Sequence, residues 1–203
     1  RPIMKKTKKK IKIKALTSCT SEQQLKVRDI RNQIGVRSNM FTDHEIGLNE
    51  HLNWISKLKS EKKQMVFAVL NSQQNPIGAV SIRMLDTFHK KADWALYLDG
   101  NEKKYEMGVA PTLEYNFIEY VFNILKLEKL NCEVIENNET VVRLHKKFSF
   151  IEEGFKRENI NKNGKRKGVY FLGLTKNEWL LNKSQIFSKY KSIFEKFTIT
   201  IEE

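Results

Sequence analysis

The sequence predicts an α/β protein in which a mixed sheet of about seven strands lies between two layers of helices. Segments with the two-residue repeat of strands alternate with segments that have the three- and four-residue repeat of helices. Their order is β-α-α-β-β-β-α-β-α-β-β. Polar turns join some neighbouring strands as hairpins, and helices separate others. Parallel and antiparallel strand pairs are therefore both expected, as in a three-layer α/β fold.

The amino-terminal part predicts one strand and two helices. Residues 11–17 (IKIKALT) alternate apolar and polar side chains, which is typical of a half-buried strand. Residues 20–23 (TSEQ) form a capping box for the first helix. The apolar stripe expected on that helix is Val27, Ile30 and Ile34. The stripe expected on the second helix, with His51 at its edge, is Leu48, Leu52, Ile55 and Leu58.

The remaining elements follow from the same periodicities. Residues 64–70 and 77–85 predict a hairpin around the polar turn 71–76, and residues 93–98 predict a fourth strand. A helix over about 109–125, a short apolar strand at 130–135 and a helix that ends near Phe148 come next. The turn at 161–164 (NKNG) separates two last strands, at about 152–160 and 167–174.

We expect three parts along the chain: a basic leader at 1–14, a domain at 15–178 and an amphipathic helical extension at 179–203. Arg1 and seven lysines in the leader supply +8 of the net charge of +13, which leaves +5 for the rest. That surplus suits an anionic small molecule, whereas the leader is typical of a solvated tail. The apolar stripe at Ile186, Phe187, Tyr190, Ile193, Phe194 and Phe197 is typical of a helix that packs on the core or forms a homodimer.

Composition indicates a soluble cytoplasmic protein. The chain has no apolar run long enough to span a membrane and no apolar segment behind the first lysines that would make a signal peptide. Cys19 and Cys132 are too few for a disulfide framework, and their spacing indicates no metal site.

The segment GVAP at 108–111 predicts a phosphate-binding helix start. Proline suits a first helical turn, where its missing N–H costs nothing, and Gly108 allows close approach of a ligand. The free N–H groups and the dipole at such a terminus favour a diphosphate. We therefore expect acetyl-coenzyme A to bind here as the donor of an acetyl group to an amine.

Two motifs resemble the GNAT acetyltransferases. The family's loop, R/Q-x-x-G-x-G/A, corresponds to Tyr105–Ala110 (YEMGVA). Its later signature, N-x-x-(small)-x-x-L-Y-x-K-x-G-F, corresponds to Asn138–Phe150 (NETVVRLHKKFSF). The resemblance covers about residues 15–175 and implies a GNAT-like fold whose sheet splays between the fourth and fifth strands.

Within that superfamily the chain is similar to pseudaminic-acid pathway enzymes that acetylate the 4-amino group of a UDP-linked dideoxy amino sugar. The similar segments are RN at 31–32, MFTDHEIGLNEHLNWISKLK at 40–59, FHKKADWALYL at 88–98 and CEVIENN at 132–138. This resemblance implies a nucleotide-sugar substrate.

The resemblance also implies where acetyl-CoA binds. Pantetheine would lie between the splayed strands like an added strand, with an N–H of Ala95 or Leu96 on the thioester carbonyl. The diphosphate would lie at Met107, Gly108, Val109 and Ala110, with Lys104 adding charge. Asn138 would lie near pantetheine, although simple N-capping explains it equally well. Gly108 is alternatively an ordinary turn glycine.

His145 and Glu133 are the expected catalytic residues. His145 stands where the family has the tyrosine that protonates the thiolate, and an imidazole N–H can replace the phenol. Glu133 matches a glutamate that acts on the amine through water, and a carboxylate on an apolar strand needs a partner or an altered pKa. The alternatives are a core histidine and a salt bridge to lysine.

Arg31, His51 and Tyr97 match positions that bind the sugar nucleotide. Arginine suits a diphosphate and tyrosine a sugar or uracil face, whereas a surface ion pair or a core aromatic is the ordinary alternative. Other open alternatives are acetylation of a protein N-terminus, a polyamine or another amino sugar, and a degenerate enzyme that only binds coenzyme A. A nucleic-acid-binding module that uses the lysine leader is disfavoured, because no strand interleaves aromatic and basic residues.

Overall fold

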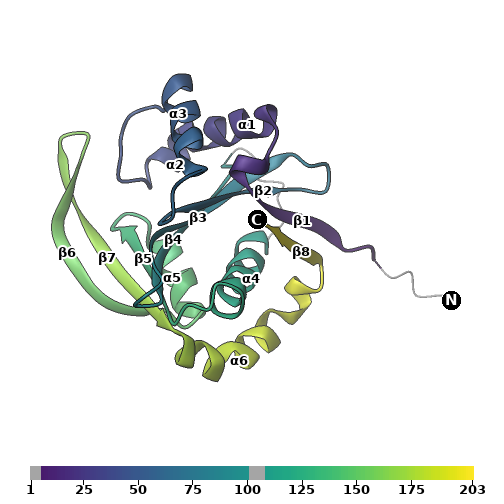
Figure 1. Ribbon diagram of the computed structural model, residues 1–203. Helices are drawn as coiled ribbons and strands as arrows, with labels where there is room; N and C mark the ends of the chain where they lie inside the picture. Colours follow the sequence, from purple (N-terminus) through teal and green to yellow (C-terminus); the bar gives the residue numbers. More distant parts are fainter. Residues whose placement is uncertain (1–5, 101–107) are drawn as a thin grey trace.

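The computed structural model describes residues 6–100 and 108–203, and the predictions for Lys104 and Met107 lie outside them. The sheet has eight strands in the order β6-β7-β5-β4-β3-β2-β1-β8 (Figure 1). The strands are β1 (Lys9–Ala15), β2 (Met65–Leu70), β3 (Pro76–Asp86), β4 (Lys91–Leu98), β5 (Lys129–Ile135), β6 (Ile151–Lys162), β7 (Lys165–Thr175) and β8 (Phe197–Glu202).

Helices cover both faces of this sheet. They are α1 (Ser21–Asn32), α2 (Ile34–Arg37), α3 (Leu48–Leu58), α4 (Val109–Asn123), α5 (Glu139–Lys147) and α6 (Lys176–Phe194), together with the 3-10 turn η1 (Leu16–Ser18). The first three helices lie on one side of the sheet and the last three on the other (Figure 1). The predicted three-layer α/β fold with a mixed sheet is confirmed, with one strand more than expected.

The pairing of the strands explains the mixed character of the sheet. β1 to β4 form an antiparallel meander with the order β1-β2-β3-β4, and β5, β7 and β6 form a second antiparallel group. A single parallel pair, β4 with β5, joins the two groups, and β8 adds to β1 in parallel. The larger core lies between the sheet and α4–α6, whereas a smaller core lies under α1 and α3.

The first and last described strands both belong to the sheet. We expected residues 1–14 to be a leader, but β1 begins at Lys9 and pairs with β2 and β8. Residues 179–203 were expected to be an amphipathic helical extension that packs on the core or forms a homodimer. α6 does pack on the core, through Trp179, Ile186 and Phe194, but Phe197 starts an eighth strand that was not expected. The alternation in FTITIE over 197–202 is the strand pattern that the helical stripe concealed.

Two predicted apolar stripes differ in the structure: that of the first helix is cut short, and that of the second is rotated. Gln33 has extended backbone dihedrals that end α1, so Ile34 falls in α2 and is 78% exposed instead of joining the stripe of Val27 and Ile30. On α3 the buried residues are His51, Ile55 and Leu58. Leu48 and Leu52, which we expected to be buried, are 47% and 44% exposed. The expected stripe, which begins at Leu48, and the observed stripe, which begins at His51, both have the spacing i, i+4 and i+7. The hydrogen bond of His51 decides between them.

Candidate active site

The two central strands separate part-way along their length. β4 and β5 pair only at Lys91–Lys129, Ala92–Leu130 and Asp93–Asn131, although β4 continues to Leu98 and β5 to Ile135. Their outer edges remain paired, with β3 up to Leu98 and with β7 up to Ile135. The edges that β4 and β5 turn toward each other beyond Asp93 and Asn131 therefore offer backbone groups to a ligand. Ala95 and Leu96 lie on this stretch of β4.

His145 lies where the strands separate. Trp94 and Cys132 are the first residues beyond the last β4–β5 pair. The ring centroid of His145 is 5.3 Å from that of Trp94, and its ring is within hydrogen-bonding reach of the Cys132 thiol. α5 ends in Lys147 two residues later, and Phe150, which stacks on Trp94, also packs against the ring at 5.3 Å.

A buried carboxylate from α4 contacts the same histidine. The Nδ1 atom of His145 is 2.6 Å from Oε1 of Glu114, and the two residues are 6% and 0% exposed. Burial by itself favours the neutral ring, but the negative charge of Glu114 outweighs it and raises the pKa of His145 to about 10. Glu114 was not predicted, although a glutamate in the apolar segment PTLEYNF is a signal that could have found it.

Glu133 lies on the opposite face of the sheet from His145. Its neighbours Cys132 and Val134 point into the core under α4–α6, so alternation directs Glu133 the other way. Partial burial raises the pKa of Glu133, and the nearby Asp93 carboxylate raises it further, while Lys156 and Arg83 oppose the shift. Burial also raises the pKa of Asp93. These two carboxylates form an acidic spot beside the separated strands.

Cationic groups gather around Tyr97 on that same face. Nη2 of Arg31 donates to the Thr42 hydroxyl at 2.9 Å, whereas its buried Nη1 has no hydrogen-bond partner among the described residues. Burial lowers the pKa of Arg31, Tyr97 acts against that shift, and Arg83 and Arg37 add to it by repulsion. Burial raises the pKa of Tyr97, so its hydroxyl is protonated at neutral pH. The structure thus brings the side chains of Arg31 and Tyr97 within interaction distance of each other.

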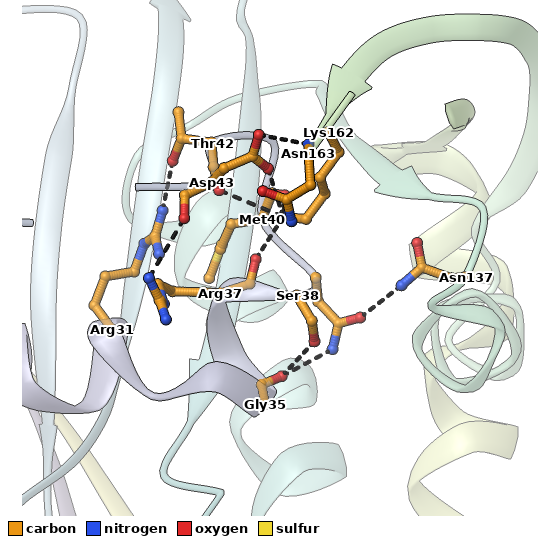
Figure 2. A network of polar contacts seen from close by, with 11 residues as sticks. Arg31, Gly35, Arg37, Ser38, Met40, Thr42, Asp43, Asn137, Lys162 and Asn163 are labelled. Carbon is orange, nitrogen blue, oxygen red and sulfur yellow. Dashed lines mark hydrogen bonds and ion pairs between the residues drawn. The ribbon is translucent and has the colours of Figure 1, made fainter. Parts of the chain in front are cut away.

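The tip of the β6–β7 hairpin docks onto the loop after α2 (Figure 2). Lys162 is 8% exposed, and its Nζ donates to the carbonyl oxygens of Arg37 and Met40 and lies 3.8 Å from Asp43. The N–H of Asn163 donates to the Asp43 carboxylate at 2.7 Å. These contacts fix the loop that carries Thr42, the partner of Arg31. Nothing in the sequence distinguishes Lys162 from the many exposed lysines.

His51 is not part of this group. Its Nε2 donates to the Gln24 carbonyl oxygen at 2.8 Å, and its ring packs against Trp54 between α1 and α3. Burial lowers the pKa of His51, which keeps the ring neutral. The charged groups that face it are Arg28 and Asp29 on α1, not Arg31 or Tyr97.

The start of α4 is held by the carboxyl-terminal segment. Gly108 has φ of 114°, and a Cβ built on it would lie 2.3 Å from Cγ2 of Ile193. The glycine is therefore required by its backbone and by the close approach of α6, in addition to any role toward a ligand. Val109 is buried, and Ala110 is half-buried in the first turn. The N–H groups of this turn have no partner within the helix, as at every helix start.

Asn138 begins α5 without capping it. Its side chain makes no hydrogen bond to the first turn, although the residue holds the N-cap position with φ of −102° and ψ of 51°. Its backbone N–H donates to the Ile135 carbonyl oxygen at 2.9 Å. The capping alternative considered for this asparagine therefore does not describe its side chain.

Comparison with known proteins identifies the family. The model of the acetyltransferase (GNAT) domain family matches residues 18–167, well over half of the chain. The chain belongs to the GNAT family of acetyltransferases. It is accordingly an acyltransferase that uses acetyl-CoA as its co-substrate, and the separated β4 and β5 strands suit this ligand.

Several GNAT enzymes resemble this chain along most of its length. A spermidine N(1)-acetyltransferase of Vibrio cholerae is 24% identical over 159 residues, which are 78% of this chain and 90% of the relative. The acetyltransferase PseH of Campylobacter jejuni is 28% identical over 140 residues, 69% and 84% of the two chains. The crystal structure of the Vibrio cholerae spermidine N-acetyltransferase with CoA and spermine has a TM-score of 0.76 at 22% identity, and the match covers 84% of this chain and 98% of that one. The last similarity concerns the fold.

No helix in the described ranges 6–100 and 108–203 is long and apolar enough to cross a membrane.

Proposed function

We propose that this GNAT enzyme acetylates the 4-amino group of a UDP-linked 4-amino-4,6-dideoxy-N-acetyl sugar, by direct attack of the amine on the thioester of acetyl-CoA. The observation that carries this proposal is the cluster of arginine side chains around Tyr97, on the face of the sheet where we expect the acceptor to bind. Arg31 and Arg83 interact electrostatically with the neutral phenol of Tyr97. Arg31 also has a buried N–H group for which the described part of the chain supplies no partner. A diphosphate offers the acceptor atoms that such a guanidinium needs, and the tyrosine ring suits a sugar or a base.

Acetyl-CoA would bind along the separated strands. Pantetheine would add to the free edge of β4, where an N–H of Ala95 or Leu96 donates to the thioester carbonyl oxygen. The diphosphate would lie at the start of α4, bound by N–H groups of Gly108, Val109 and Ala110. Lys104, Met107 and the side chain of Asn138 complete the proposed contacts.

Glu133 would remove a proton from the amine through a water molecule. A general base works best when its pKa is near the working pH, and the raised pKa of Glu133 supports this role. Glu133 and His145 lie on opposite faces of β5, which suits a base on the acceptor side and an acid near the sulfur. His145 would donate a proton to the departing thiolate.

A polyamine is the second candidate acceptor. The acidic spot of Asp93 and Glu133 would bind a cationic amine, and the Vibrio cholerae relative is named for spermidine. Against this candidate, Arg31, Arg37 and Arg83 repel a polycation. We therefore favour the anionic acceptor, with the acidic spot binding the single amino group.

Release of the coenzyme A thiol measured with each acceptor tests the choice. We expect turnover with a UDP-4-amino sugar and little with spermidine or an amino-terminal peptide. Replacing Arg31 with alanine should raise KM for the sugar nucleotide by about 10- to 100-fold, because a charged hydrogen bond contributes about 1.5–3 kcal/mol. KM for acetyl-CoA should not change.

Arg143→Ala is the matched control, since Arg143 is exposed on α5, across the sheet from the acceptor. Faster thiol release with spermidine than with any UDP-4-amino sugar, together with an unaffected R31A variant, would refute the nucleotide-sugar assignment.

A further inference from the structure

Glu114 and His145 form a buried acid–base pair between α4 and α5. The pair joins Nδ1 of His145 to Oε1 of Glu114, and its members are almost fully buried. The second oxygen of Glu114, Oε2, has no hydrogen-bond partner among the described residues. A carboxylate with half of its hydrogen bonds missing is costly in a dry core, so the contact with His145 must hold it in place.

The side chains packed around this pair are uncharged or point elsewhere, which leaves His145 as the partner of Glu114. Cys132 from β5 and Tyr190 from α6 both have raised pKa values, chiefly because of burial, so they are neutral at physiological pH. Asp93 from β4 interacts with Cys132, and its own pKa is raised by burial. Trp94 and Phe150, which pack against the imidazole, carry no charge. Among the described residues, Glu114 is therefore the anionic group that contacts the imidazole.

We propose that Glu114 is a positioning residue that keeps a proton on the Nε2 atom of His145, directed toward the sulfur of coenzyme A. A glutamate–histidine pair would thus do the work of a hydroxyl group at this position. The inference deepens the proposed function and rests on the proposed role of His145. It adds a residue from a different helix to the chemistry.

As long as Glu114 and His145 share one proton, the Nε2 atom of His145 keeps its own hydrogen. When the ring is positively charged, both nitrogens carry hydrogen and Nδ1–H bonds Glu114. Nε2–H can then donate to a sulfur atom, either that of the Cys132 thiol within reach of the ring or that of bound coenzyme A. When the shared proton lies on Glu114 instead, Nδ1 accepts it and Nε2 still carries hydrogen. Nε2 loses its hydrogen only when the pair loses a proton and Nδ1–H donates to the carboxylate. A histidine without this carboxylate would choose either tautomer.

The transfer step then balances. The amine nitrogen forms a bond to the thioester carbonyl carbon, and the C–S bond breaks with its electron pair on sulfur. The proton on Nε2 moves to that sulfur to give the free thiol of coenzyme A. The proton lost by the amine passes through water to Glu133 and from there to solvent, and the Glu114–His145 pair takes up a proton from solvent before the next turnover.

The pH dependence of kcat/KM tests the inference through Glu114→Gln. In the native protein, activity should persist to high pH and fall only near the pKa of His145, about 10, where the pair loses its proton. In E114Q the anion that raises the pKa of His145 is gone while burial still lowers it, so this pKa should fall well below that of the native protein. We expect E114Q to lose about 10- to 100-fold in kcat at pH 8–9 with KM values little changed. Its falling limb should move to lower pH.

Glu128→Gln is the matched control. Glu128 makes an exposed ion pair with Lys90 at 3.9 Å, so the same chemical change there should leave the profile unchanged. An E114Q profile that coincides with that of the native enzyme would overturn the inference about Glu114. Full activity of His145→Ala would instead remove the proposed role of His145 itself, so the two failures are distinguishable.

A double-mutant cycle separates positioning from simple packing. His145→Tyr supplies a hydroxyl donor that needs no carboxylate, and it leaves Glu114 buried without a cation. We expect E114Q to lower both Tm and kcat in the native background but to raise both in the H145Y background. A glutamate that only packs would make E114Q equally costly in the two backgrounds, which would also overturn the inference. If tyrosine does not fit, His145→Asn gives the same comparison of Tm.

Discussion

Individual residues at this site differ in how much the sequence reveals about them. His145 could be found because it occupies a defined place in a recognisable motif, and the structure brings it to the point where β4 and β5 separate. Its partner Glu114 lies 31 positions away in the sequence. No spacing rule connects those two positions, since their contact depends on how α4 and α5 lie over the sheet. Lys162 is a similar case, because its three carbonyl partners are supplied by a loop distant in sequence.

Gly108 gives a test at the scale of one residue. Replacing it with alanine adds a methyl group at a positive φ and within 2.3 Å of the Ile193 side chain. Gly164 also has a positive φ, 75°, but open space around it. Gly164→Ala should therefore cost only the backbone strain, about 1–2 kcal/mol, while G108A should cost distinctly more. Thermal and urea unfolding measure both.

Adding Ile193→Ala to G108A should recover the difference, because it removes the group that clashes. If G108A and G164A have equal effects, the packing of α6 against this glycine is not tight, and the glycine would serve its backbone or a ligand alone. KM for acetyl-CoA of the G108A/I193A protein then reports on that second role, since its contact with α6 is relieved.

Elements are predicted well where a local pattern is enough to define them. The capping box at Thr20 and Gln23 forms both of its hydrogen bonds, and the hairpin of β2 and β3 pairs as expected. The face that a helix buries is harder to predict, because apolar spacing on α3 permits two stripes. His51 resolves it by donating to the Gln24 carbonyl oxygen on α1, a contact that requires both helices to be in place. β8 was missed because a helical stripe runs into it without a break.

The orientation of α3 can be tested with two similar substitutions. Ile55 is 4% exposed, so Ile55→Ala should cost about 2–5 kcal/mol through lost burial and a cavity. Leu52 is 44% exposed, and Leu52→Ala should cost well under that amount. The free energies of unfolding from urea denaturation make the comparison. Equal losses would mean that the helix presents the stripe expected from the sequence instead.

At the scale of the molecule, the first and last described strands close the fold together. β8 pairs with β1 in parallel from Lys9–Phe197 to Lys14–Glu202, so the first and last strands form one edge of the sheet. α6 reaches that edge by passing beneath α4 and α5 (Figure 1). Tyr115 on α4 contacts Trp179, Phe187 and Phe194 along it. The helix that carries Glu114 is thus held from both sides, by the sheet and by α6.

This arrangement predicts that the carboxyl-terminal strand supports the acetyl-CoA side of the enzyme. Phe197 is 5% exposed and lies in the main core, and Phe197→Ala should cost about 3–5 kcal/mol. At about 2–4 °C per kcal/mol, Tm should fall by about 6–20 °C. Thr198→Ala is the control, because the next side chain along the strand faces solvent. If the carboxyl-terminal strand did not contribute to the fold, Tm would be unchanged in both variants.

The ring of Phe197 also lies beside Gly108. F197A should therefore raise KM for acetyl-CoA more than KM for the acceptor, whereas a purely global loss of stability would leave both KM values unchanged below Tm.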